Sequence, residues 1–557
     1  MTATENRVTT GLRSGPLTWG QQLLWLGYLA TPPDRRSGHT VVQAFDVPGD
    51  ASTAMVAEAL TTLADRHETL RTTFHLPGGG DAYQVVHEPQ PIPVAERTAD
   101  DLADGVAAAT AELRAVSFDL AVPGLVRAIL IVVDSGPARL LVATHHIVID
   151  GWSWGVLRRE FDTLVRAWIN GVAPALPPVP WQPLDQADAE HSESGQRANA
   201  AALRYWEHQL TMLPDRVLPG GADEPSGQHI VVMESPAFAA ALRWLSARYR
   251  IVDATLILAA FCAVLGVVTG RDRAIVMTMS SNRLGSRTRD LVACHAQYTV
   301  VNLDLRGDPS FAELVARAGA AVLTAYRHGH YDFQQMKALE SDRARRRGVV
   351  FSQPAGFNFK RYATESLTHT DPGPPPSLST SDTMVDVQPF GGNCARGVVL
   401  LSVRPAVEAT GLELLCDGAA LASTAMTDLV RAMETWVLAG MAEPAMRLSA
   451  LPELCGVRPP ALGVDWALVD HCWVYLPDVA HALRECPGVT GAGAFADQAG
   501  SLVAYVAGTA QPADLRDQVL KAAAAGRAVI APHRYVVCGT APTDERDLAA
   551  WQRMARR

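Results

Sequence analysis

The chain has 557 residues, of which 48% are hydrophobic and 19% are charged, and its formal net charge is −10. This length exceeds what one ordinary hydrophobic core organises and suits two or three domains. The negative charge argues against a general nucleic-acid binder. The eight cysteines include no CxxC pair, which argues against a zinc site or a disulfide framework and favours a reducing cytoplasm.

The beginning of the chain, residues 1–15, is polar and lacks the apolar stretch of a secretory signal, so we expect a flexible start. The longest uncharged apolar run, residues 254–270, falls just short of the roughly 20 residues that a membrane span needs. It also contains threonines and glycines, which favours a buried core helix. We therefore expect no membrane association.

The first block of the chain has a mixed α/β pattern, in which apolar residues recur at helical spacing in some stretches and alternate in others. The expected helices are 21–30, 52–70, 107–116 and 152–168, and the expected strands are 39–47, 71–76, 82–88, 125–133 and 138–149. Residues 170–195 are rich in proline and polar residues and predict a linker.

Similar alternation of strands and helices continues beyond this linker. We expect four regions in all: a flexible N-terminus at 1–15, a first domain at 16–180, a second at 181–445 and a smaller third at 446–557.

The stretch HHIVIDG places four polar or small residues where a buried strand meets a helix. Adjacent histidines on a strand point to opposite faces, and no HExxH or cysteine cluster accompanies them, so we predict no metal site. His145 and His146 are then either packed histidines or include an acid/base catalyst, because the histidine pKa of about 6.5 lies near neutral pH. Asp150 would orient the loop through a buried ion pair with an arginine, and Gly151 would provide a tight turn with an accessible N–H.

The chain resembles the condensation domains of nonribosomal peptide synthetases, which belong to the chloramphenicol-acetyltransferase-like superfamily. Their HHxxxDG motif is complete at 145–151, RHxxLRTxF is matched at 66–74, FDLxxxPLLRAxL is approached at 118–130, and yWxxqL is matched at 204–210. The resemblance covers about residues 17–444.

One segment departs from the family pattern. Where the family has IGxFVNTLPLR, this chain has AQYTVVNLDLR, with Gln297 at the position of the glycine. The segment lies near the tunnel in relatives, so we expect an unusual substrate choice. Cys294 and His295 precede it and would alternate across a strand, so we do not expect a catalytic Cys–His pair.

The resemblance implies an α/β fold of two chloramphenicol-acetyltransferase-like lobes in a V shape with a central tunnel, plus a small α+β C-terminal domain. It implies a free-standing condensation enzyme that transfers an acyl or aminoacyl group from a carrier-protein phosphopantetheine thioester to an amine. Ester formation onto a hydroxyl and a catalytically inactive recruitment platform are the alternatives. The expected partners are a donor carrier protein and a carrier-bound or free acceptor, without nucleic acid, a membrane, ATP or a bound cofactor, in the cytoplasm.

The resemblance also assigns roles at the motif. His146 would be the acid/base group, the Gly151 N–H would hold the thioester oxygen, and His145 would pack in the core. Asp150 would form a buried ion pair with Arg66, or failing that with Arg71. The candidate substrate-tunnel residues are Trp206, Gln297, Trp152 and Ser153.

The last part of the chain resembles the small C-terminal subdomain of adenylation enzymes, with CPGV at 486–489 and LVAYV at 502–506. Where that family carries PNGK with its adenylate-forming lysine, this chain has TDERDL at 543–548, and no lysine follows Lys521. We therefore expect a degenerate unit without ATP chemistry that serves in docking or stabilisation.

Overall fold

The computed structural model divides the chain into two compact units. Unit 1 contains the chain up to Ala202 together with two later segments, Ser280–Gln297 and Gly329–Met336. Unit 2 contains Leu203–Met279, Tyr298–His328 and the chain from Lys337 onward. The residues that the structure describes are 13–78, 80–133, 138–218, 229–351, 354–359, 373–390, 398–405, 409–416, 423–497 and 500–555.

A four-stranded sheet in the order β2-β7-β6-β5 forms the centre of unit 1. β7 pairs antiparallel with β2 from Ala138↔Val47 to His145↔Thr40, so it is held along its whole length up to the first histidine of the motif. β6 pairs antiparallel with β7 and parallel with β5. The strands are β2 (Thr40–Val47), β5 (Val94–Thr98), β6 (Val126–Val132) and β7 (Ala138–His145).

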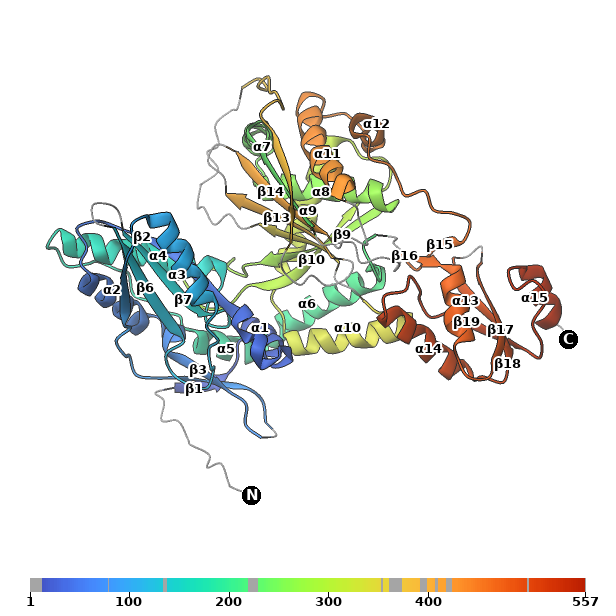
Figure 1. The fold of residues 1–557 in the computed structure, drawn as a ribbon, viewed down its shortest axis with the longest axis horizontal. Coiled ribbons are helices and arrows are strands. Elements are labelled where there is room, and N and C mark those ends of the chain that lie inside the picture. Colours follow the sequence, from blue (N-terminus) through green and yellow to red (C-terminus); the bar gives the residue numbers. More distant parts are fainter. Residues whose placement is uncertain are drawn as a thin grey trace. The chain divides into compact units, whose positions relative to one another are not determined.

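The helices of unit 1 cover this sheet, with α3 packing on β6 and β7 and α2 packing along α4 (Figure 1). A second, three-stranded sheet has the order β1-β4-β3. The remaining elements are β1 (Arg13–Pro16), α1 (Trp19–Ala30), η1 (Pro33–His39), α2 (Thr53–Arg66), η2 (Glu68–Arg71), β3 (Thr72–His75), β4 (Tyr83–Val86), α3 (Leu102–Arg114), α4 (Gly151–Ile169), α5 (Pro183–His191) and α6 (Glu193–Met212), whose second half belongs to unit 2.

The helix that follows the motif, α4, is amphipathic because its apolar residues recur every three or four positions. Val156, Phe161, Leu164 and Val165 are fully buried in the unit 1 core. This packing fixes the N-terminus of α4, and thereby the position of the motif residues just before it.

A seven-stranded mixed sheet in the order β10-β9-β11-β13-β14-β8-β12 organises unit 2. β9, β11 and β13 are parallel, whereas β14, β8 and β12 continue the sheet antiparallel. The strands are β8 (His229–Ser235), β9 (Arg273–Ser280), β10 (Gln297–Asp304), β11 (Ala355–Phe359), β12 (Met384–Pro389), β13 (Val399–Pro405) and β14 (Thr410–Cys416). The accompanying helices are α7 (Pro236–Tyr249), α8 (Asp253–Thr269), α9 (Phe311–Arg327), α10 (Phe333–Arg347), which begins in unit 1, α11 (Ser423–Ala442), η3 (Leu448–Ala450) and α12 (Leu451–Cys455).

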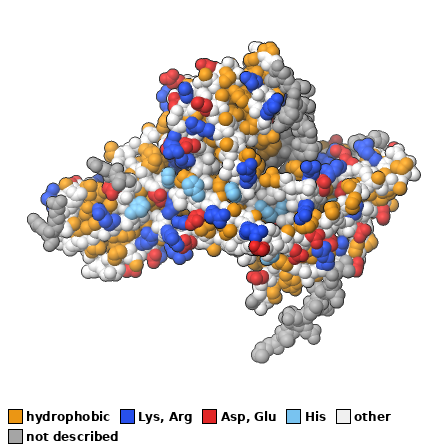
Figure 2. All heavy atoms as spheres, turned by 180° about the vertical axis from the view of Figure 1, so that it is seen from behind, with side chains coloured by type: hydrophobic (Ala, Val, Ile, Leu, Met, Phe, Trp, Pro, Cys, Tyr) orange, Lys and Arg blue, Asp and Glu red, His pale blue; other side chains and the backbone are white. Residues whose placement is uncertain are grey.

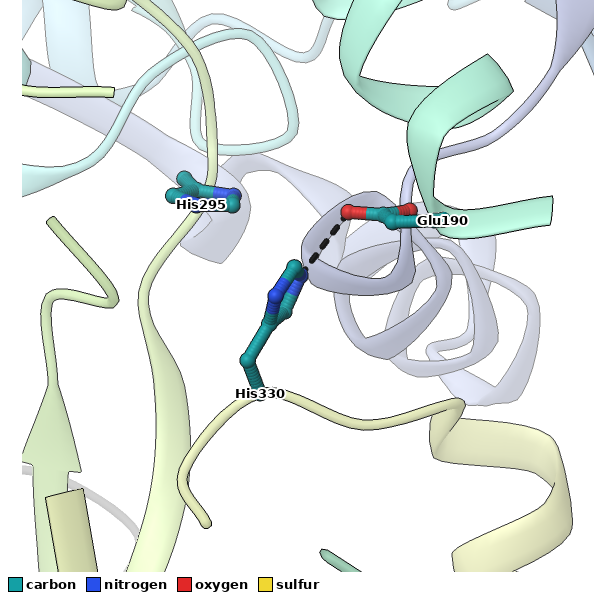
Figure 3. Close-up of side chains that lie close together, drawn as sticks. All are labelled: Glu190, His295 and His330. Atoms are coloured by element: carbon teal, nitrogen blue, oxygen red, sulfur yellow. Dashed lines mark hydrogen bonds and ion pairs between the residues drawn. The ribbon is translucent and has the colours of Figure 1, made fainter. Parts of the chain in front are cut away.

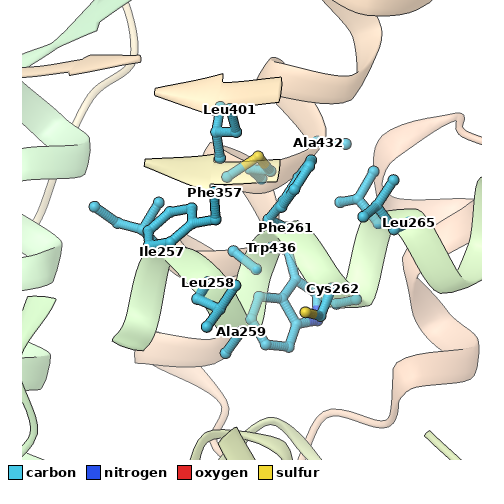
Figure 4. Packing of buried hydrophobic residues seen from close by; sticks show 14 of the residues in the cluster. Ile257, Leu258, Ala259, Phe261, Cys262, Leu265, Phe357, Leu401, Ala432 and Trp436 are labelled. Atoms are coloured by element: carbon cyan, nitrogen blue, oxygen red, sulfur yellow. The ribbon is translucent and has the colours of Figure 1, made fainter. Parts of the chain in front are cut away.

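The apolar run at 254–270 forms the core helix α8, as the sequence predicts. Phe261 and Cys262 are fully buried among side chains of the sheet and of α11, including Phe357, Leu401 and Trp436 (Figure 4). Among the described residues, no single helix has both the length and the apolar character of a membrane span. The pair α7 and α8 meets those two criteria only when joined across a bend of 108°.

The last part of unit 2 is a small α+β arrangement with its own apolar cluster. Its sheets have the orders β15-β16 and β17-β18-β19. The elements are β15 (Trp466–Val469), β16 (Cys472–Tyr475), α13 (Leu476–Arg484), β17 (Val489–Ala496), β18 (Leu502–Gly508), α14 (Pro512–Ala524), β19 (Arg534–Cys538) and α15 (Leu548–Ala555). This order agrees with the strand, helix and two strands expected from the sequence.

The structure departs from the sequence-based expectations at several boundaries. β7 ends at His145 rather than at Ile149, α5 lies inside the expected linker, and the first compact unit continues to Ala202 rather than ending at residue 180. The small C-terminal arrangement is grouped with unit 2 but has its own apolar cluster. Residues 13–15 of the expected flexible start belong to β1, which pairs with β4, and residues 1–12 lie outside the described residues.

Charged side chains of both signs are interspersed on the face of the molecule shown in Figure 2. This mixture agrees with a chain whose acidic and basic residues number 58 and 48.

Candidate active site

The motif occupies the short connection between β7 and α4. Asp150 is the N-cap residue of α4, with an extended backbone (φ −112°, ψ 178°), and its carboxylate accepts a hydrogen bond from the Ser153 N–H at 3.0 Å. Aspartate suits this position because its side chain satisfies one of the N–H groups that a helix leaves free at its start. Gly151 is the first helical residue, so the helix offers no acceptor to its N–H.

His145 is packed in the core of unit 1, as expected. Its ring is fully buried, stacks on His39 at 5.3 Å between centroids and meets Tyr28 edge-on at 5.4 Å. Nδ1 accepts the N–H of Ile147 at 3.1 Å. Burial, together with His39 and His146, lowers the pKa of His145 to about 3, so this ring is neutral at physiological pH.

His146 differs from its neighbours because it is partly exposed, whereas residues 141–145 and 147–150 are buried. Its backbone N–H donates to the His39 carbonyl at 2.9 Å, and its ring Nδ1 lies 2.8 Å from the Ile149 carbonyl oxygen. A carbonyl oxygen only accepts, so Nδ1 carries the proton and the neutral ring keeps its lone pair on Nε2. Nε2 has no hydrogen-bond partner among the described residues, and this tautomer is the one that a general base requires.

Asp150 forms a buried bidentate ion pair with Arg283, whose Nη1 and Nη2 lie 2.7 and 3.0 Å from its two oxygens. The same carboxylate accepts the backbone N–H groups of His295 and Ala296, each at 3.0 Å. The exposed fractions of the Arg283 and Asp150 side chains are 0% and 2%. Burial by itself would raise the pKa of Asp150, but Arg283 and the hydrogen bonds outweigh it, so the pKa is lowered.

The predicted pairing of Asp150 with Arg66 or Arg71 is therefore wrong. Arg66 pairs with Glu160 at 3.0 Å, and Arg71 donates to the backbone carbonyls of Ala64 and His87. Both lie on η2 or at the end of α2, where nearer acceptors satisfy them. Their part in the folded unit is to hold α2 and η2 in place, not to neutralise Asp150.

Arg283 escaped the sequence analysis because 133 residues separate it from Asp150. It follows Asn282, which has a left-handed backbone (φ 57°) that asparagine tolerates better than most residues. The Asn282 side chain donates to the His295 carbonyl at 3.0 Å. The sequence feature that could have indicated Arg283 as the partner is an arginine just after the apolar strand β9, followed by a polar turn.

Three of the four expected tunnel residues are buried. Ser153 is fully buried and its Oγ takes part in the Asp150–Arg283 network, 2.8 Å from Asp150 and 2.9 Å from Arg283 Nη2. Gln297 is also fully buried and donates to the Tyr331 carbonyl at 2.8 Å, and Trp206 is 3% exposed. Their burial gives no support to the expected tunnel role, which remains a prediction.

Trp152 is the exposed member of that set. Its side chain is 37% exposed, and its indole N–H donates to the Arg289 carbonyl at 2.8 Å.

The neighbouring Cys294 and His295 do not form a reactive pair. Burial raises the pKa of the Cys294 thiol, and its Sγ lies 3.7 Å from the Gly20 carbonyl oxygen. A thiol must ionise to act as a nucleophile, so this geometry agrees with the sequence-based prediction.

A complete HHxxxDG loop on this scaffold matches a known family. The family model described as Condensation domain covers residues 16–391. The chain belongs to the condensation-domain family. Phosphinothricin tripeptide synthetase PhsB of Streptomyces viridochromogenes is 29% identical over 335 residues, which is 58% of this chain and 28% of that protein. Malpinin synthetase of Mortierella alpina is 29% identical over 334 residues, which is 58% of this chain and 4% of that protein. The chain thus spans only a small part of the curated relatives that it matches.

Solved condensation domains share the fold. The first condensation domain of the calcium-dependent antibiotic synthetase, in complex with a substrate analogue, superposes with a TM-score of 0.60 at 18% identity and covers 79% of this chain and 98% of that one. The X-domain in its complex with OxyB from teicoplanin biosynthesis gives a TM-score of 0.56 at 22% identity, with 81% and 98% coverage. The α/β fold expected from the sequence is thereby confirmed.

Proposed function

We propose that this chain is a condensation enzyme of nonribosomal peptide synthesis, which forms an amide bond between a carrier-bound acyl or aminoacyl thioester and an amine. The observation that carries this proposal is the tautomer of His146. Its Nδ1–H is directed at the Ile149 carbonyl oxygen, and its Nε2 has no partner among the described residues on a partly exposed ring.

The reaction moves one proton. As the amine nitrogen attacks the thioester carbon, Nε2 of His146 takes the proton that the nitrogen loses. The C–S bond then breaks, and the leaving phosphopantetheine thiolate takes this proton from His146. General-base assistance of this kind contributes roughly 10²–10⁴-fold. Holding both reactants together contributes more, about 7–11 kcal/mol when orientation is good.

The N-terminus of α4 supports the developing negative charge. Gly151 is its first residue, and the first N–H groups of a helix point outward with the positive end of the helix dipole. We assign the Gly151 N–H to the thioester oxygen. The buried Asp150–Arg283 pair holds this helix start in place without touching the substrate.

The test is the rate of amide formation by wild type and His146→Ala. A panel of aminoacyl thioesters of pantetheine is offered with a panel of amines, and products are detected by mass spectrometry. We expect His146→Ala to lose at least about a hundredfold in kcat/KM, whereas His481→Ala, an exposed histidine of α13, retains full rate. An unchanged rate in His146→Ala would remove this residue from the mechanism.

Two other functions remain as candidates. With hydroxyl acceptors in the same panel, a rate above that for amines would assign ester formation instead. A recruitment platform is the second candidate, because the structurally similar X-domain was solved in complex with OxyB. Absence of product with carrier-loaded donors, together with stable binding of a partner protein, would favour the platform over the enzyme.

We further propose that residues 446–557 stabilise unit 2 and have no ATP chemistry. Asp470 accepts Arg347 Nε at 2.7 Å, and the Trp473 indole donates to the Thr269 carbonyl at 2.8 Å. The TDERDL segment is used for packing, since Glu545 pairs with Arg484 at 2.8 Å. ATP–pyrophosphate exchange by the purified chain would contradict this proposal.

A further inference from the structure

Three side chains that the condensation chemistry does not use converge within unit 1. Glu190 comes from α5, His295 from the segment before β10, and His330 from the segment before α10 (Figure 3). One ligand atom from each lies within 4.8 Å of the other two. His330 Nε2 and Glu190 Oε1 are 2.8 Å apart, and the two imidazole rings are 4.7 Å apart between centroids.

His295 is the member that a simple ion pair does not explain. It is 1% exposed, and its Nδ1 is buried without a hydrogen-bond partner among the residues that the structure describes. A buried polar atom without a partner costs about 1–3 kcal/mol, so a contact that completed the bonding of this ring would stabilise the protein.

Glu190 is held rigidly in a position to serve as an anionic ligand. It is 2% exposed, its Oε2 accepts the Trp19 backbone N–H at 2.7 Å, and its Oε1 accepts the Gln186 amide at 3.0 Å. A buried carboxylate requires a compensating cation. A divalent cation bound between Glu190 and the two imidazoles would supply that charge.

We propose that Glu190, His295 and His330 bind a divalent transition-metal ion of the zinc class. Two imidazoles and one carboxylate are a ligand set that zinc uses, with three protein ligands and a fourth position for water. Bonds of about 2.1 Å require ligand atoms roughly 3–4 Å apart, so the side chains need to move by less than about 1 Å. His330 is 27% exposed, which leaves solvent access for the fourth ligand.

Such an ion would join segments that are far apart in the sequence. The two histidines lie in the later segments Ser280–Gln297 and Gly329–Met336, which return to unit 1, and Glu190 lies in its continuous part. The N–H of His295 donates to Asp150. The ion therefore stabilises the segment that positions the HHxxxDG loop, and this role holds whether or not the chain catalyses amide formation.

The test is metal binding by the 557-residue chain without a polyhistidine tag. The protein is stripped with a chelator and titrated with Zn²⁺ by calorimetry, and with Co²⁺ by visible absorption, which reports the coordination number. We expect a single equivalent to bind and to raise the thermal unfolding midpoint. His330→Ala and Glu190→Gln should each bind at least about tenfold more weakly.

His191→Ala is the matched control, because it removes an exposed histidine next to Glu190 on α5 and should leave binding unchanged. His330→Ala removes a partly exposed ring, so it is expected to fold, which circular dichroism verifies. Wild type that binds no Zn²⁺ or Co²⁺, or variants that bind as tightly as wild type, would overturn the proposal and leave a His–Glu ion pair as the role of the cluster.

Discussion

Replacing Asp150 by asparagine should destabilise unit 1 far more than its small size suggests. Each carboxylate oxygen accepts three hydrogen bonds: Oδ1 from the Ser153 N–H, Ser153 Oγ and Arg283 Nη2, and Oδ2 from Arg283 Nη1 and the N–H groups of His295 and Ala296. Asparagine has one acceptor oxygen and one NH₂ group. In either orientation, donors of Arg283 and of the backbone therefore face another donor.

The magnitude follows from burial. Removing one partner of a buried ion pair costs about 3–5 kcal/mol, because the remaining charge is uncompensated. Arg283 is fully buried, so solvent does not replace the lost carboxylate. Since domains are stable by about 5–15 kcal/mol, Asp150→Asn should consume much of the stability of unit 1 and yield largely insoluble protein.

The assay is the soluble fraction on expression and the midpoint of urea unfolding followed by tryptophan fluorescence. Asp290→Asn is the matched control, because it breaks a pair with Arg159 of the same 2.7 Å length whose partners are 61% and 58% exposed. That change should cost no more than about 1 kcal/mol. If Asp150→Asn unfolded at the same urea concentration as Asp290→Asn, burial of the Asp150–Arg283 pair would not account for the stability of unit 1.

Three further predictions follow from the same loop and its surroundings. Gly151→Pro removes the N–H proposed to hold the thioester oxygen, but proline suits the first helical position after the extended Asp150. We expect kcat of this variant to fall by about 10²–10³-fold. Gly151→Ala is the control, because it keeps the N–H and should keep most of the rate. The pKa of His145 is about 3 in the folded protein and about 6.5 in the unfolded chain, so its contribution to stability is complete above pH 6.5 and is lost as the pH falls toward 3. Urea unfolding at stepped pH measures this loss. Between about pH 6 and 4, the free energy of unfolding of His145→Gln should fall less steeply than that of wild type, by about 1.4 kcal/mol per pH unit. Cys294 is buried with a raised pKa, so a thiol reagent should label it only after unfolding, and rapid labelling of this residue in native protein would contradict its placement.

The sequence by itself determined the local elements and the motif. Alternation and helical spacing predicted β7, α4 and the core helix α8, because these patterns depend only on which side chains must leave water. The polar residues at the end of β7 marked the candidate site, and the assignment of His145 to the core was confirmed by its burial. Boundaries were predicted less accurately, since β7 ends where the chain turns to cap α4 rather than where apolar residues stop.

Only the tertiary structure decided which distant groups complete the site. Asp150 needs a buried cation, but its charge alone does not tell Arg66 from Arg71 or Arg283, since local patterns carry no information about a contact across 133 residues. The same reason hid the cluster of Glu190, His295 and His330, which come from three separate segments. The tertiary structure also placed Ser153 in the hydrogen-bond network of Asp150 and Arg283. Local side-chain chemistry is written in the sequence, whereas the partner of each buried charge depends on how the later segments return to the first unit.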